Sequence, residues 1–584
     1  MKLRSFFVTL GLVVLVLLGI SAGGWVWLAA QSPLMLLSQT RATSPAAAMF
    51  VPKQAPAMVS LLVNPDELEA VRVAIAPANQ RRQARTEVAQ LKSSLLSGRN
   101  LDYDTDIKPW LGSEVTLAVT TPDVDRDQAN GSQPGYLLAL ETRDGDRARE
   151  FLQVLWQRRA IAGVNLVFEQ YAGVKIISGQ PSRVVGLPTG DLPGDAGDGT
   201  LATAVVGDRF VLVANAPKVL RDAINNVQAA SLNLSSNPTY RQSLTQLAET
   251  PIGMAYVNLP SLGQWLDLPE RQLSSAIDDD AGDTAPLIDR MVAGIELNPQ
   301  GILANTVLLA AEGHPFPMAP PALSHPVEAL KTIPLGSAVV AGGTHLNTLL
   351  PQLNATLQTY GVLSALVTPA LQRAKQELGI PLTQDWVDWV EGEFALAWLP
   401  EDDNGQQWVF AGETSEATAT ALAQMDAIAQ RNGLGTGPVT LADQTAYAWT
   451  KLTTPDTTRR RRNRQSLDVL QVDVRGVHTQ VDRYEVFATS LDAMEAALNA
   501  RAAPLLKDAE FQRAIAPLNP RNNGYLYIDW PAVRPTLEAQ LPILRLAELA
   551  AKPLFDHVRS LTMSSYGSDP TAQRGAVFVR LSEE

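Results

Sequence analysis

The chain has 584 residues, a formal net charge of −13 and no cysteine. Without thiols it forms no disulfide, thiol nucleophile or cysteine metal site, so a large domain must be held together by its apolar core. An acidic chain of this kind repels nucleic acid and anionic headgroups at long range.

The N-terminus predicts a membrane anchor. An apolar run covers residues 6–30 and follows Lys2 and Arg4. As a helix rising ~1.5 Å per residue, this run is long enough to cross a bilayer core of roughly 30 Å. We therefore expect residues 1–30 to be an uncleaved transmembrane signal anchor, with cleavage near Ala30 as the alternative. The basic residues place the N-terminus in the cytoplasm and the remaining chain outside the cytoplasmic membrane or in an equivalent lumen.

Residues 31–49 are rich in Ser, Thr, Ala and Pro and predict a flexible tether. β-Rich runs follow in pairs, and apolar positions with helical spacing fall between the pairs. The expected strand pairs are 115–119 with 136–140, 166–168 with 174–177, 203–206 with 210–213, and 292–297 with 302–309. The expected helices cover residues 146–159, 216–227 and 239–247. This arrangement predicts an α+β fold, with an antiparallel sheet and helices packed on one face.

The chain also repeats itself. One motif, Asp-x-x-x-Trp-x-x-x-Glu, occurs twice at an offset of 279 (385 − 106): Asp106, Trp110 and Glu114, then Asp385, Trp389 and Glu393. Three later segments recur at offsets of 274, 271 and 267: 207–210 with 481–484, 253–260 with 524–531, and 287–290 with 554–557. A repeat this long predicts duplicated domains, because each copy can bury its own core. We expect two tandem homologous halves, residues 50–311 and 327–584, joined at residues 312–326 by a semi-rigid linker with five prolines.

The repeated residues are expected to be structural anchors. Asp106 and Asp385 stand where the N-cap of a short helix belongs, a place where a carboxylate accepts free backbone amides. Trp110 and Trp389 are expected in the core, because a buried indole removes a large apolar area from water; ligand stacking is the alternative. The three aspartates of residues 102–106 open like a calcium loop, but the Gly and Glu that an EF-hand needs are missing. No metal site is therefore predicted.

One loop is strongly basic, and it carries Arg459, Arg460, Arg461, Arg462 and Arg464 between two β-like runs. The corresponding loop of the first half, residues 181–200, is rich in Gly, Pro and Asp. Two interpretations of the basic loop stay open. It docks on an anionic partner or on lipid headgroups, or it is a solvated loop that is free to change its charge.

Catalytic signatures are absent from the sequence. It has no P-loop, nucleophile elbow, zinc-protease helix or dinucleotide-binding motif, and its five histidines lack metal-ligand spacing. No cofactor is predicted. These observations lean against an enzyme, although two scattered carboxylates would suffice for a glycosidase-like hydrolase.

The anchor, the duplicated Asp-x-x-x-Trp-x-x-x-Glu pattern and the paired turns 208–210 and 482–484 resemble the domain of unknown function 3352 family. The resemblance spans nearly all of residues 50–584. It implies a mainly cyanobacterial protein in the cell envelope or thylakoid lumen, and it brings no activity or catalytic residues with it. We therefore expect a single-pass membrane protein whose ectodomain, in the periplasm or thylakoid lumen, binds or scaffolds an envelope or lumenal protein or lipid. The alternatives are a carrier or chaperone for an apolar molecule and a carboxylate-dependent hydrolase.

Overall fold

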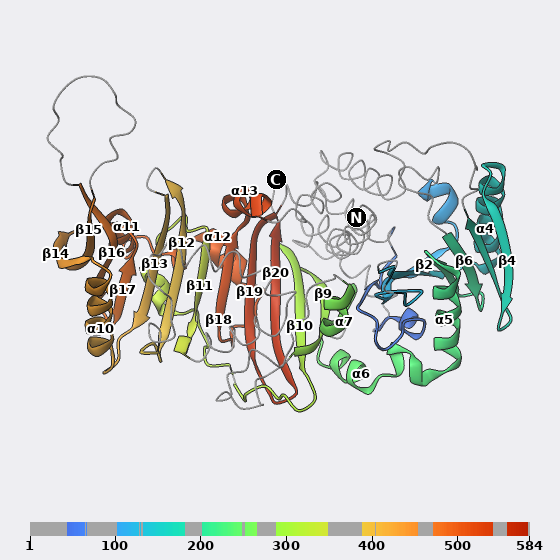
Figure 1. Ribbon diagram of the computed structural model, residues 1–584, viewed down its shortest axis with the longest axis horizontal. Helices are drawn as coiled ribbons and strands as arrows, with labels where there is room; N and C mark the ends of the chain where they lie inside the picture. The colour runs from blue at the N-terminus through green and yellow to red at the C-terminus, as the bar shows by residue number, and fades with distance from the viewer. Residues whose placement is uncertain are drawn as a thin grey trace, which may run out of the picture.

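The structure is a computed structural model of the chain (Figure 1). It describes residues 44–64, 66, 102–127, 129, 132–180, 201–247, 251–265, 288–298, 300–319, 321–347, 388–402, 405–453, 471–540 and 558–581. Within these ranges, no helix has both the length and the apolar character needed to cross a membrane. The predicted anchor at residues 1–30 lies outside them, so it stays a prediction.

The described strands form one antiparallel sheet of 20 strands along the long axis of the molecule (Figure 1). The first strand set runs in the order β4-β5-β6-β7-β3-β2-β1-β8-β9-β10. The second strand set runs in the order β14-β15-β16-β17-β13-β12-β11-β18-β19-β20. With helices between the strands, the fold is α+β, as the sequence predicts.

The bounds of the elements are as follows. The first set contains β1 (Ala57–Leu61), β2 (Leu111–Thr121), β3 (Gly135–Thr142), β4 (Asn165–Tyr171), β5 (Val174–Gln180), β6 (Leu201–Val206), β7 (Phe210–Ala214), β8 (Gly253–Asn258), β9 (Ile288–Asn298) and β10 (Gly301–Ala310). The second set contains β11 (Val339–Thr344), β12 (Glu393–Asp402), β13 (Gly405–Glu413), β14 (Gly435–Leu441), β15 (Gln444–Thr453), β16 (Gln471–Val481), β17 (Tyr484–Ala488), β18 (Gly524–Asp529), β19 (Val558–Ser568) and β20 (Ala572–Leu581).

The α-helices are α4 (Gly145–Ile161), α5 (Pro217–Gln228), α6 (Pro238–Leu244), α7 (Leu259–Trp265), α10 (Thr418–Arg431), α11 (Leu491–Asn499), α12 (Ala509–Ile515) and α13 (Trp530–Gln540). Single turns are η3 (Ala46–Met49), η4 (Tyr103–Ile107), η6 (Ala230–Leu232), η7 (Leu234–Ser236), η8 (Glu328–Thr332) and η11 (Leu505–Lys507). Helices α4, α5 and α6 occupy the three segments in which the sequence predicts helices.

The strand registers of the two sets reproduce three of the sequence offsets. Ala57 of β1 pairs with Val119 of β2, and at the matching place Val339 of β11 pairs with Trp398 of β12. The two partner residues, Val119 and Trp398, differ by 279 (398 − 119). The corresponding partners in β8 and β18 differ by 271, and those in β7 and β17 differ by 274. In β9 and β19 the offset is 270 (561 − 291). Residue 287 and its expected counterparts, residues 554–557, lie outside the described residues, so the offset of 267 stays a prediction there.

Strands β10 and β20 join the two sets. The antiparallel pairs run from Gly301–Arg580 to Leu309–Ala572 and are centred on Asn305–Ala576. The central residues Asn305 and Ala576 differ by 271, the offset that also relates the registers of β8 and β18. The two sets therefore meet edge to edge through their last strands, which run antiparallel.

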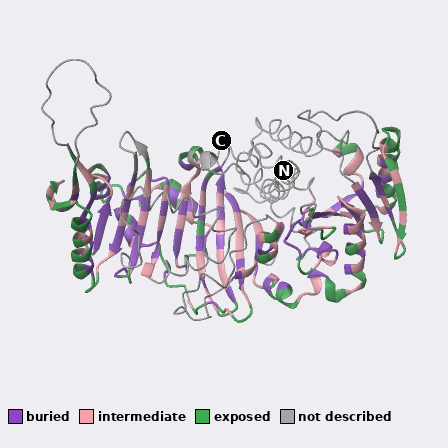
Figure 2. Ribbon diagram, in the orientation of Figure 1, coloured by how far each residue is buried: buried purple, intermediate pink, exposed green. Residues whose placement is uncertain are grey.

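Helices cover both faces of the sheet toward its ends, which corrects the prediction that they pack on one face. Val211 and Val213 of β7 pack with α4, whereas Leu212 and Ala214 pack with α5. Successive side chains of a strand point to opposite faces, so α4 and α5 lie on opposite sides. In β17, Phe487 likewise packs with α10, and its neighbours pack with α11. Figure 2 shows the buried positions of the strands and the exposed outer faces of these helices.

Two predicted connecting segments are part of the folded structure. Residues 46–49, assigned to the tether by the sequence, form η3, in which Ala47 and Ala48 are fully buried. The rest of the predicted tether up to residue 43 lies outside the described part of the chain. The predicted linker is fastened to the second set, because Ala319 forms a β-bridge with Ser568 and Leu323 forms one with Asn522.

Candidate functional site

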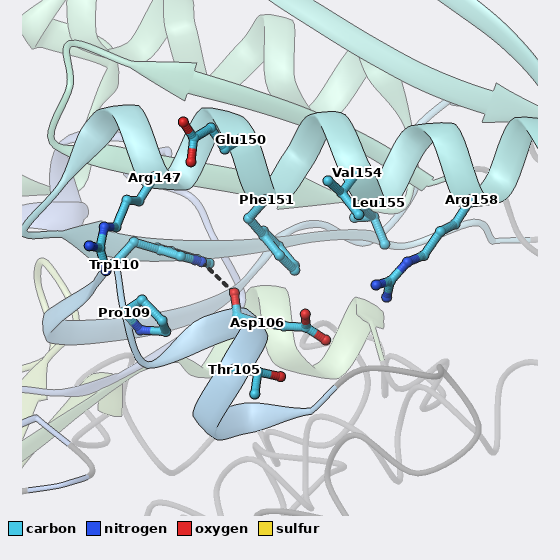
Figure 3. A pocket seen from close by; sticks show the side chains of 10 residues that line it. All are labelled: Thr105, Asp106, Pro109, Trp110, Arg147, Glu150, Phe151, Val154, Leu155 and Arg158. Atoms are coloured by element: carbon cyan, nitrogen blue, oxygen red, sulfur yellow. Dashed lines mark hydrogen bonds between the residues drawn. The ribbon is translucent and has the colours of Figure 1, made fainter.

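A groove of about 370 Å3 separates η4 from α4 near the β4 end of the sheet (Figure 3). It is lined by Thr105, Asp106, Pro109, Trp110, Arg147, Glu150, Phe151, Val154, Leu155 and Arg158. Two of these residues, Asp106 and Trp110, belong to the motif that the sequence repeats. The first copy of the repeated motif therefore contributes two residues to the lining of the groove.

One wall of the groove is the π-helical turn η4, which aspartates stabilise. The Asp102 carboxylate accepts hydrogen bonds from the Thr105 backbone N–H at 2.9 Å and from the Thr105 hydroxyl at 2.9 Å. These bonds hold the pKa of the Asp102 carboxyl below its usual range. Asp106 in turn accepts a bond from the Asp102 backbone N–H at 2.9 Å. The predicted N-cap role of Asp106 is thus wrong: Asp102 is the cap, and Asp106 bonds back to it as in a capping box.

Trp110 forms the floor of the groove and anchors it to the core. Its indole N–H donates to the Asp106 carbonyl at 2.8 Å, and the residue is 1% exposed. Its ring lies 5.4 Å from the ring of Phe151 on α4. The buried indole thus connects η4 with Phe151 of α4, as expected for a residue whose main role is packing.

The other wall is the solvent-facing side of α4. Asp144 caps this helix, because its carboxylate accepts a bond from the Arg147 backbone N–H at 3.1 Å. Ala148, Leu152 and Trp156 bury one stripe of the helix in the core. Between that stripe and solvent, Phe151, Val154 and Leu155 turn toward the groove, with arginines at either end (Figure 3). The groove therefore combines apolar walls with positive ends.

The two acids of the groove are not arranged for acid–base catalysis. The Asp106 carboxylate is bonded to the Asp102 amide, below the Phe151 ring. Glu150 lies on the outer side of α4 and points away from Asp106 (Figure 3). A hydrolase with paired carboxylates needs both groups to face one scissile bond. In the groove, Asp106 and Glu150 therefore do not face a common point.

Each repeated glutamate stabilises a buried helical turn. Glu114, 2% exposed, accepts hydrogen bonds from the Ala46 and Ala47 backbone N–H groups, both at 2.8 Å. Glu393 accepts one from the Ala329 N–H at 3.1 Å. Burial raises the pKa of the Glu114 carboxyl. Since η3 and η8 are short, their free amides need such acceptors, and the two carboxylates are structural.

Arg209 and Arg483, which stand in the two repeated turns, both form ion pairs with glutamates of the sheet. Sequence reasoning missed this link. Arg209 pairs with Glu141 of β3 at 3.1 Å. Arg483 pairs with Glu393 at 3.3 Å and with Glu413 of β13 at 3.6 Å. The available signal was the recurrence of a glutamate, at positions 141 and 413, on the strand that follows each repeated motif.

Comparison with known proteins identifies the family. A family model described as "Protein of unknown function (DUF3352)" matches residues 10–581. The chain belongs to this family. No curated protein matches this DUF3352 chain in sequence. A solved structure titled "Structure of crystal form I of TP0453" is similar at 9% identity and a TM-score of 0.24, covering 46% of this chain and 80% of that one. A similarity this low supports no argument about the DUF3352 fold or its function.

The remaining sequence-predicted residues of the DUF3352 chain fall into two groups. Trp389 is 3% exposed and packs with Phe410 and Phe487, as expected for a core residue. Asp385 and the arginines of residues 459–464 lie outside the described residues, so their predicted roles stay predictions. The structure places the ends of β15 and β16 at residues 453 and 471, on either side of the basic loop.

Proposed function

We propose that this DUF3352 member is a membrane-anchored, non-enzymatic binding or scaffolding protein with its ectodomain in the periplasm or thylakoid lumen. The observation that carries the proposal is the sheet itself, which continues from β4 to β14 through the β10–β20 junction. Shared backbone hydrogen bonds make such a sheet stiff along its length. It can hold partners bound at its two ends at a fixed separation, as a scaffold requires.

We also infer that the two strand sets are tandem repeats of one duplicated module. Their strand orders are the same, and three of their registers carry the offsets found in the sequence. The buried glutamates capping η3 and η8 recur at equivalent places. Equivalent edges meeting across β10 and β20 are what a fused two-fold pair would show.

The groove beside α4 is the surface that we assign to a partner. Apolar side chains with nearby charges are typical of protein contact sites, whose centre is apolar and whose rim is polar. Val154 is 43% exposed there, and Ile161 at the end of α4 is 88% exposed. A carrier for an enclosed apolar ligand is the less favoured alternative, because the groove is open and carries Arg147, Glu150 and Arg158.

Photo-crosslinking in the native membrane tests this proposal. A photoreactive amino acid replaces Val154 in the groove, and the matched control carries it at Gln424, an exposed position on α10 of the second set. We expect a discrete adduct at Val154 that is absent at Gln424 and disappears when Leu155 is changed to Glu. Equal adducts at both positions, or none at Val154, would contradict a partner site in the groove.

A further inference from the structure

The second strand set buries a histidine between two carboxylates. His478 of β16 is 5% exposed, and its Nδ1 lies 2.8 Å from Oε1 of Glu485 of β17, which is 4% exposed. Nε2 of His478 has no hydrogen-bond partner within the described ranges. It faces Oδ1 of Asp426 on α10 at 4.0 Å. Asp426 is fixed by the Trp449 indole N–H, which donates to it at 2.7 Å.

Aromatic rings enclose the imidazole. The ring of Tyr447 stacks on one side at 5.6 Å and that of Phe487 on the other at 5.4 Å, with interplanar angles of 25° and 23°. Trp449 lies at 5.5 Å. The face of an aromatic ring carries negative charge and attracts a cation placed over it. These neighbours therefore favour a positively charged ring.

The cluster is particular to the second set. The cross-strand pair Tyr447–His478 occupies the place of the pair Ile177–Thr203 in the first set, at strand offsets of 270 (447 − 177) and 275 (478 − 203). There, Thr203 accepts a hydrogen bond from the Trp156 indole at 2.8 Å. The position equivalent to Glu485 is Val211, at the β7 offset of 274 (485 − 211). The first set thus fills this site with a neutral contact.

The charges around His478 decide its protonation. The ionisable groups that face the ring are Glu485 from β17, Asp426 from α10 and Tyr447 from β15. A neutral ring that donates to Glu485 through Nδ1 points the lone pair of Nε2 at the Asp426 carboxylate, which is repulsive. A ring protonated on both nitrogens donates to Glu485 and attracts Asp426, and it gives the buried Glu485 the partner that a buried charge needs.

We propose that His478 carries a proton on both nitrogens and acts as a proton-dependent latch that holds α10 on β16 and β17. Loss of that proton as the pH rises turns the attraction to Asp426 into repulsion and loosens α10. The latch is independent of the partner groove, which lies in the first strand set. At the equivalent place of the first set, Thr203 and Val211 carry no titratable side chain, so this particular response to pH belongs to the second set.

Two measurements on the full-length chain test the latch. Selective 15N labelling of its five histidines distinguishes a ring with two N–H groups from a neutral ring, and His478→Gln assigns the signal. We expect two N–H groups on His478 at pH 7. Hydrogen exchange, corrected for the intrinsic effect of pH, should show α10 exchanging faster relative to α4 as the pH rises. A neutral ring at pH 7, or a constant ratio of α10 to α4 exchange, would overturn the proposal.

Variants separate the latch from general packing. Glu485→Gln removes the charge that faces Nδ1, so we expect the second ring N–H of His478 to be lost at pH 7. Asp443→Asn, in the tight turn between β14 and β15, removes a charge from the same hairpin and serves as the matched control, with both N–H groups retained. Loss in both variants, or in neither, would refute the assigned geometry. If Glu485→Gln fails to fold, the parent spectrum and the exchange series decide the question alone.

Discussion

Replacing Gly301 with alanine tests whether β10 and β20 join the two strand sets into one sheet. Gly301 is buried at the end of β10 and pairs with Arg580. A Cβ atom at this position would lie 2.2 Å from the Val579 carbonyl oxygen and 2.5 Å from the Phe578 ring. That oxygen belongs to the backbone of β20 and Phe578 is fully buried. Neither can move aside unless the two strands separate.

The expected cost follows from two opposing effects. Overpacking of this kind destabilises a protein by about 1–3 kcal/mol. Replacing glycine within a strand returns about 0.5–1 kcal/mol, because glycine loses more backbone freedom on folding. The net loss in the free energy of unfolding is therefore about 0–2.5 kcal/mol, with a midpoint of ~1.2 kcal/mol. For a cooperative unit of about 150–250 residues, the midpoint lowers the melting temperature by roughly 2–5 °C.

Thermal unfolding followed by circular dichroism, with hydrogen exchange by mass spectrometry, measures the effect of Gly301→Ala. Amides of β10 and β20 should exchange faster than in the parent chain, while β4 and β14 stay unchanged. The control is Gly437→Ala in β14, where a Cβ atom meets nothing within 4 Å. Unchanged melting and unchanged exchange at the junction in Gly301→Ala would refute the pairing of the two sets in this register.

Three further predictions concern the repeated residues and the basic loop. Glu114→Gln leaves one of two buried amides without an acceptor, a loss of about 1–3 kcal/mol. Burial raises the pKa of the Glu114 carboxyl, so the parent gains stability as the pH falls toward the ordinary glutamate range and the variant does not. The difference in unfolding free energy should therefore grow on acidification, and a constant difference would contradict it. Trp110→Ala should lower stability by about 3–5 kcal/mol in denaturant titrations, with Trp110→Phe losing less. Changing the five arginines of residues 459–464 to Ser should reduce pelleting with anionic liposomes, and unchanged pelleting would remove lipid docking from consideration.

Sequence reasoning predicted the elements well where one face of an element is buried. Residues 146–159 show the periodicity of an amphipathic helix, and the structure has α4 there. Sequence reasoning was wrong about which faces of the sheet the helices cover. The reason is that β7 is a run of five apolar residues, which shows no alternation of apolar and polar side chains. Such a run is typical of a strand buried on both faces. The sequence therefore contains the signal, but the pairing of strands alone does not reveal it.

The candidate site was predicted less well, because its contacts are distant in sequence. Asp102 and Asp106 both suit an N-cap, and only the backbone of η4 decides between them. The Arg209–Glu141 pair joins residues 68 positions apart (209 − 141), and it depends on the register of β3 with β7. Hydrophobic patterns predict which residues are buried, but they do not fix which polar groups meet across strands.

The two strand sets agree at the centre of the sheet and differ at its ends, and this distribution has a physical cause. Central strands are held by neighbours on both edges, so their registers and the buried glutamates tolerate little change. The outer strands are less constrained, and their edges must be protected from pairing with other chains. β14 carries Pro438, which cannot donate to a further strand, whereas β4 has no proline and exposes Phe168 under the Lys175 ammonium at 5.2 Å. The groove and the His478 cluster also lie in the outer parts. If the chain is a scaffold, as proposed, we expect the ends of the sheet to select its partners and the centre to fix the distance between them.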